Sequence, residues 1–267
     1  MKKNSESTKV DPKTPSSDIS DDILDKEFDR AVAFIKKTLK DAEQKEGPNH
    51  PSVANVLGHL GGLYHDFGKS TEAVPLFQRA LAIQEKALGK DHPEVAKTLS
   101  NLAVVYDVLR QFSEAETHWK RALEIQKKAL GPDHLFVSNT QTLLGVSYAR
   151  QIKLAKATPL LQRALVIRQK ELKPDHPGVV EAMENLAGVY TLQKKYFAKA
   201  ETLWKRALEI REKSLTTTTD IENIILNLIL LYKAQGMRSK EKQFKKYLNE
   251  IADINNDRQA KLEKIKL

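Results

Sequence analysis

Apolar side chains recur along this chain with the spacing of amphipathic helices. Near the middle, Val95, Leu99, Leu102 and Tyr106 follow one another at intervals of four, three and four residues, which places them on one face of a helix. A second helical pattern begins at Phe112, directly after the polar pair Arg110-Gln111. The two patterns together predict a helix, a tight turn and a second helix.

This helix pair repeats at an interval of 42 residues. One tyrosine marks the first helix of every unit: Tyr64, Tyr106, Tyr148, Tyr190 and Tyr232. One histidine opens each of the four full units: His50, His92, His134 and His176. A single pair cannot bury its apolar stripe, so neighbouring pairs must stack to form a continuous core. We therefore predict an all-α solenoid of antiparallel helix pairs.

The repeat also predicts the domain boundaries. We expect a disordered polar tail at 1–21, a half-repeat helix at 22–49, and full repeats at 50–91, 92–133, 134–175 and 176–218. A degraded fifth repeat or cap is expected at 219–250, followed by a charged C-terminal helix or tail at 251–267. An atypical polar last unit suits a solenoid end, where no further unit stacks.

Two local features support this interpretation. Asp91 stands before Pro93 and three residues before Glu94, so we predict that Asp91 caps the first helix of its unit. Small residues recur where the two helices of a pair should approach closely, because a bulky side chain there would push the backbones apart. On the first helices these are Gly61, Ala103, Gly145 and Ala187.

The residues at these offsets resemble the tetratricopeptide repeat. The segments Leu88–Pro93, Thr98–Tyr106, Glu114–Glu116 and Arg121–Ile125 look like the kinesin-light-chain type of that repeat, over about residues 28–250. The resemblance implies a right-handed superhelix whose first helices line a groove that binds a protein or peptide partner. In the resembled family, asparagines at the places of Asn101, Asn185 and Asn227 contact cargo peptides.

Counting from each repeated tyrosine gives the candidate groove positions. Five residues earlier stand mostly asparagines, interrupted by His59 and Leu143, and nine residues earlier a second polar row. Asparagine can both donate to and accept from a peptide backbone, although it is a poor helix former. The alternative is that these amides bond to neighbouring helices and only order the stack. The candidate set is Asn55, His59, Lys97, Asn101, Asn139, Arg150, Glu181, Asn185, Asn223, Asn227 and Lys233.

The sequence offers no comparable pattern for chemistry. The 267 residues contain no cysteine, and the seven histidines lack metal-ligand spacing, so we expect no metal, no cofactor and no catalysis. Gly68-Lys69-Ser70 follows a predicted helix rather than a strand, which favours a turn over a phosphate-binding loop. Trp119 and Trp204 recur at one repeat position and are interpreted as packing residues rather than as stacking platforms for bases.

Charge supplies the main alternative function. The formal net charge is +9, and residues 236–267 hold nine Lys and Arg against five Asp and Glu. This segment is either a solvated helix face or a surface for nucleic acid or another acidic partner. A self-assembling structural subunit is a third alternative. The sequence shows neither a secretory signal nor an apolar run long enough to span a membrane, and we expect a cytoplasmic protein.

Overall fold

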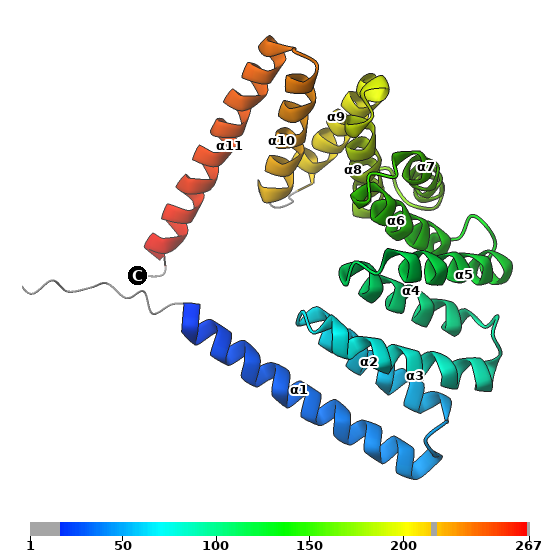
Figure 1. Ribbon diagram of the computed structural model, residues 1–267. Helices are drawn as coiled ribbons and strands as arrows, with labels where there is room; N and C mark the ends of the chain where they lie inside the picture. The colour runs from blue at the N-terminus through cyan, green and yellow to red at the C-terminus, as the bar shows by residue number, and fades with distance from the viewer. Residues whose placement is uncertain (1–16, 215–217, 266–267) are drawn as a thin grey trace, which may run out of the picture. The chain divides into compact units, whose positions relative to one another are not determined.

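The computed structural model describes residues 17–214 and 218–265. Within these ranges the chain forms eleven α-helices and one short 3₁₀ helix, with no strand (Figure 1). The predicted all-α fold is confirmed. The chain divides into two compact units, Met1–Lys90 and Asp91–Leu267, and each is described in turn.

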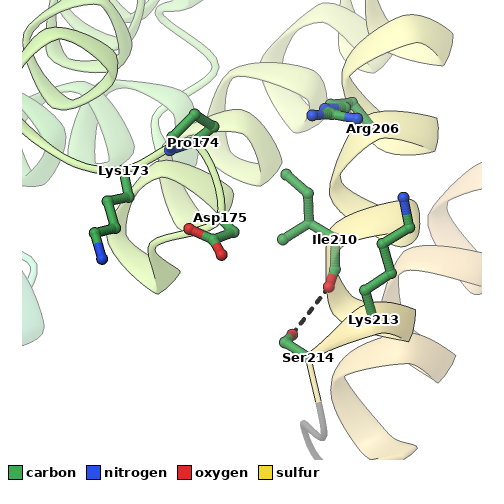
Figure 2. Close-up of a pocket in the computed structure, with 7 residues that line it drawn as sticks. All are labelled: Lys173, Pro174, Asp175, Arg206, Ile210, Lys213 and Ser214. Atoms are coloured by element: carbon green, nitrogen blue, oxygen red, sulfur yellow. Dashed lines mark hydrogen bonds between the residues drawn. The ribbon is translucent and has the colours of Figure 1, made fainter.

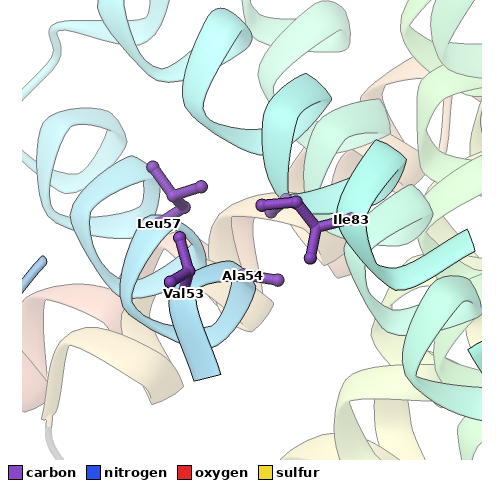
Figure 3. Packing of buried hydrophobic residues seen from close by; sticks show 5 residues of the cluster. Val53, Ala54, Leu57 and Ile83 are labelled. Atoms are coloured by element: carbon purple, nitrogen blue, oxygen red, sulfur yellow. The ribbon is translucent and has the colours of Figure 1, made fainter. Parts of the chain in front are cut away.

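The first unit contains α1 (Ser17–Glu46), α2 (Pro51–Asp66) and α3 (Ser70–Leu88). The middle helix α2 packs against both of the others. On one side, Phe28 and Val32 of α1 pack with Leu60 of α2. On the other, α2 and α3 share a core of buried residues (Figure 3): Val53, Ala54, Leu57, Ala80 and Ile83. Of the expected polar tail, residues 1–16 lie outside the described residues, and α1 begins at Ser17.

The second unit contains four consecutive helix pairs. They are α4 (Pro93–Val108) with α5 (Phe112–Leu130), α6 (Leu135–Arg150) with α7 (Leu154–Glu171), α8 (Pro177–Leu192) with α9 (Phe197–Lys213), and α10 (Thr218–Ala234) with α11 (Arg238–Ile265). Trp204 follows Trp119 by 85 residues, one more than two repeats of 42, so one extra residue precedes the second helix of this unit. The 3₁₀ helix Lys194–Tyr196 accommodates it. Each of the first helices α4, α6, α8 and α10 approaches the next to within 8 Å between Cα atoms, whereas no such backbone approach joins the second helices α5, α7, α9 and α11 over the described residues. Second helices meet through long side chains, such as Lys240 of α11 and Glu201 of α9. The first helices therefore form the closely spaced row of this stack.

Histidine, not aspartate, caps the first helices of the four full repeats. His92 is the N-cap of α4, and its Nδ1 accepts a hydrogen bond from the backbone N–H of Glu94 at 3.2 Å. The same bond forms at His50, His134 and His176, which cap α2, α6 and α8. The prediction that Asp91 caps α4 is therefore wrong, because the helix begins one residue later than that role requires. Asp91 instead accepts a hydrogen bond from Lys128 at 2.9 Å.

Small residues hold the helices of a pair close together, as the sequence indicates. A Cβ atom built on Gly145 of α6 would lie 2.8 Å from Cγ of Leu161 on α7. Trp119 and Trp204 are buried at the corresponding position of their own second helices, and Trp204 donates to the Thr191 hydroxyl at 3.1 Å. The interpretation of both tryptophans as packing residues is confirmed.

Candidate peptide-binding face

The candidate residues all lie on first helices, and none is fully buried. In the first unit, Asn55 and His59 are exposed on α2. In the second unit, the candidates lie on α4, α6, α8 and α10, whose mutual contacts bring them into one row. We call this set the inner face: Lys97, Asn101, Asn139, Arg150, Glu181, Asn185, Asn223, Asn227 and Lys233.

Two residues of the inner face are held by a buried arginine that the sequence pattern did not single out. Arg168 of α7 donates to Oδ1 of Asn139 at 3.0 Å and forms an ion pair with Glu181 at 2.9 Å. It also donates to the Ser138 hydroxyl and to the carbonyl oxygen of Gly178. Arg168 thus links α6, α7 and α8. The available signal was the 42-residue spacing, which places Arg168 in register with Gln84 and Gln126.

A second polar link joins α4 to α6. Asp107 is buried on α4, where its carboxylate accepts hydrogen bonds from Ser147 and Arg150 of α6. Arg150 remains about half exposed. This candidate residue therefore has a structural partner.

The asparagines of the inner face differ in what they already bind. Nδ2 of Asn227 donates to the backbone carbonyl of Asn223, one turn earlier in α10, at 2.8 Å. Asn101 and Asn185, on α4 and α8, make no side-chain hydrogen bond to any residue that the structure describes. An ordering role within the stack therefore applies to Asn139, while Asn101 and Asn185 keep their full hydrogen-bonding capacity.

Apolar side chains accompany the polar row on the same helices. Leu143 of α6 and Leu230 of α10 are exposed beside the asparagines. Val108 and Leu192, two residues after the repeated tyrosines, are exposed near the ends of α4 and α8. The face thus combines amides that can bind a peptide backbone with apolar contacts for its side chains.

Ion clusters on the second helices tie successive pairs together. Glu201 of α9 accepts hydrogen bonds from Tyr232 of α10 at 3.0 Å and from Lys240 of α11 at 2.9 Å. Burial alone would raise the pKa of Glu201, but hydrogen bonds from Lys205, Lys240 and Tyr232 outweigh it and lower this pKa to about 2. The same holds for Glu116 on α5. Burial would raise its pKa, but hydrogen bonds from Lys120 and Tyr148 outweigh burial and lower it. These carboxylates are structural and lie outside the candidate set.

A pocket of about 460 Å³ opens between the loop that precedes α8 and the helix α9, away from every candidate residue (Figure 2). Its charged lining is Lys173, Asp175, Arg206 and Lys213. In the two preceding repeats the equivalent aspartate binds the second helix, as Asp133 does with Lys170. Here Arg206 and Lys213 pair with Glu209 of α9 instead. The pocket therefore lies where the preceding repeats have a hydrogen bond between the loop aspartate and a lysine of the second helix.

The sequence offered three further candidates: the glycine turn at Gly68, the histidines and the basic C-terminal segment. Gly68 lies in the turn between α2 and α3 with a φ of 72°, as expected for a turn glycine. No group of three or more His, Cys, Asp or Glu side chains that could hold a metal ion occurs among the described residues. On α11, three lysines bind glutamates: Lys240, Lys245 and Lys246. No helix in the described ranges is long and apolar enough to cross a membrane.

Comparison with known families matches the tetratricopeptide repeat at residues 23–86, 59–116, 108–165 and 143–213. The chain belongs to the tetratricopeptide-repeat family. Together these matches cover most of the chain, including α2 to α9, where the 42-residue period is most regular. Among curated protein sequences, none is significantly similar to this tetratricopeptide-repeat chain.

Solved tetratricopeptide-repeat structures share the fold. BtubC (BKLC) from P. vanneervenii superposes with a TM-score of 0.73 at 21% identity, over 86% of this chain and 92% of that one. A kinesin-light-chain-like protein of Podospora anserina with nearly identical repeats gives a TM-score of 0.69 at 26% identity, over 77% and 98%. The repeats of this chain are accordingly of the kinesin-light-chain type.

Proposed function

We propose that this chain is a non-catalytic scaffold that binds a peptide segment of a partner protein along the inner face. Tetratricopeptide-repeat solenoids typically serve as protein-interaction scaffolds, and this fold is present here. The observation that carries the proposal is the exposure of Asn101 and the partial exposure of Asn185, neither of which has a hydrogen-bond partner in the described structure. Because asparagine disfavours helices, unpaired asparagines repeated within helices call for a role beyond folding.

The chemistry of the face favours an extended peptide. An asparagine amide offers donors and an acceptor, so it can bind a backbone whatever side chains that backbone carries. The exposed Leu143 and Leu230 would then contact the side chains of the peptide. Recognition by both backbone and pockets is a common way for a protein to combine affinity with specificity.

The proposal can be tested with a random library of 12-residue peptides displayed on phage. A peptide selected on the full chain is synthesised with a fluorescent label and titrated against Asn185→Ala and Asn227→Ala. Each variant loses hydrogen bonds worth about 0.5–1.5 kcal/mol, so each should weaken binding by about 2- to 12-fold. Helicity should not fall, because alanine is the better helix former.

The matched control is the pair of substitutions Lys245→Glu and Lys246→Glu on α11, which alters charge but leaves the inner face intact. This variant should bind the selected peptide like the wild-type chain. If the lysine variant fails to bind while both asparagine variants bind normally, the basic surface of α11 is the site and the proposal is wrong.

A further inference from the structure

We infer that Arg168 is a positioning residue that sets the charge and hydrogen-bonding preference of the inner face at the third and fourth repeats. The inference rests on the proposed function, because it concerns the ligands that this face selects. Arg168 itself is only 6% exposed and does not reach a ligand. It acts through Asn139 and Glu181, the two exposed side chains that it binds.

The bond to Asn139 fixes which end of its amide faces a ligand. Since Arg168 occupies Oδ1 of Asn139, the two N–H groups on Nδ2 are left to donate. Asn227 has the opposite arrangement, because its Nδ2 donates to Asn223 and its Oδ1 remains available to accept. The inner face therefore presents donors at Asn139, suited to a peptide carbonyl or a carboxylate, and an acceptor at Asn227, suited to a peptide N–H.

The bond to Glu181 cancels a charge that would otherwise dominate this part of the face. The Glu181 side chain is 54% exposed, whereas that of Arg168 is 7% exposed. A ligand on the inner face can therefore contact Glu181, whereas Arg168 acts as a buried counter-charge beneath it. Without Arg168, the carboxylate would favour basic ligands and oppose acidic ones.

The repeats themselves supply the comparison. Gln126 occupies the register of Arg168 one repeat earlier, and Asn139 occupies the register of Glu181. Both earlier residues are uncharged, so the arginine and the glutamate of the later repeat replace two neutral residues as a pair. Gln126 is also buried, and its Oε1 has no hydrogen-bond partner in the described structure, so one repeat earlier the helices stack with an uncharged residue at this position. A stacking role alone therefore does not require the ion pair.

The test uses the random 12-residue phage library on four full-length proteins: wild type, Arg168→Gln, Glu181→Gln and the double variant. The readout is the ratio of basic to acidic residues in the selected peptides. Arg168→Gln should raise this ratio by about 2- to 5-fold, the range expected for one exposed charge pair, and Glu181→Gln should lower it similarly. The double variant should return to the wild-type ratio, a rescue that a purely structural role of Arg168 would not produce.

Arg163→Gln is the matched control, because it removes one positive charge from the same helix where Arg163 pairs with exposed Asp133. This control should leave the ratio unchanged. An unchanged ratio in a stably folded Arg168→Gln protein would overturn the inference. If Arg168→Gln does not fold, the Glu181→Gln protein provides the test, because Glu181 is exposed and its replacement should not disturb folding. An unchanged ratio of basic to acidic residues in that protein would also overturn the inference.

Failure of the inference is distinguishable from failure of the proposed function. If Asn185→Ala and Asn227→Ala weaken binding while the charge ratio stays constant, the inner face binds peptides and only the role of Arg168 is wrong. If the selected peptides bind these asparagine variants as tightly as the wild-type chain, the inner face is not the site, and both claims are wrong.

Discussion

Arg150 on α6 donates a hydrogen bond to the buried carboxylate of Asp107 on α4, which also accepts from Ser147. A side chain predicted to bind a partner is thus tied to the preceding first helix. The side chain of Asp107 is 1% exposed, and that of Arg150 is 56% exposed. The desolvation cost of this ion pair therefore falls mainly on Asp107, because only its side chain is removed from water.

Arg150→Ala should destabilise the second unit by leaving the Asp107 carboxylate buried without its counter-charge. Removing one partner of a fully buried pair costs about 3–5 kcal/mol, and the exposure of Arg150 reduces our expectation to about 1–3 kcal/mol. Urea unfolding followed by circular dichroism measures this loss. Arg163→Ala, which breaks an exposed pair with Asp133, should cost no more than about 1 kcal/mol. Equal losses for the two variants would contradict the account.

Ile152→Gly should stabilise the protein. The turns between paired helices use a residue of positive φ at Gly68, Arg110 and Ile152, which are 42 residues apart, and again at Gly236, two repeats after Ile152. Ile152 is β-branched with a φ of 58°, a conformation that costs an L-residue roughly 1–2 kcal/mol, and its side chain is 69% exposed. We expect a gain of about 1 kcal/mol in the free energy of unfolding. Lys194→Gly is the control, because the fourth turn forms a 3₁₀ helix instead, and it should give no gain.

Gly145→Ala and Gly188→Ala should act in opposite directions. Alanine in place of helical glycine contributes about 1 kcal/mol of stability when space is open, as it is at Gly188. At Gly145 the new methyl group would meet the buried Leu161 at 2.8 Å, and overpacking costs about 1–3 kcal/mol. Thermal melts of the two variants should therefore place Gly145→Ala below Gly188→Ala. The reverse order would show that α6 and α7 can separate without cost.

Acid should weaken the link between α9 and its neighbours. The folded pKa of Glu201 is lowered from 4.5 to about 2, so its ionised form stabilises the fold. That stabilisation is fully present above about pH 4.5 and is lost as the pH falls towards 2. Glu201→Gln should lower stability at neutral pH and flatten the acid dependence over that window, as measured by urea unfolding at several pH values. Glu124→Gln, at an exposed position of α5, is the control and should leave the stability at neutral pH unchanged.

The repeat period made most of the fold predictable, because every unit solves the same packing problem with the same residue types. Tyr106 and its equivalents fixed the register, and the recurrence of Trp119 and Trp204 at one repeat position was enough to indicate packing. The N-cap was missed because aspartate is a commoner cap than histidine, and only the helix start distinguishes Asp91 from His92.

The sequence could place the candidate residues on the first helices, but it could not predict which of them already have hydrogen-bond partners. Register places Asn139 and Asn185 on equivalent helices, yet only Asn139 is bound by a second-helix arginine. A periodic pattern identifies residues that recur in every repeat. Arg168 and Asp107 each link neighbouring helices at one place only, so the period does not reveal them. Their contacts join side chains about 30 to 40 residues apart, and no local spacing rule encodes such pairs.

The most direct test of peptide binding on the inner face is nuclear magnetic resonance of the asparagine side-chain amides, recorded while the phage-selected peptide is titrated into the full chain. We predict saturable shifts of the Nδ2 signals of Asn101, Asn185 and Asn227, with a single dissociation constant, and little change at the backbone amides of Lys245 and Lys246. Saturable shifts confined to α11 or to the second helices, with the asparagine signals unmoved, would contradict the account.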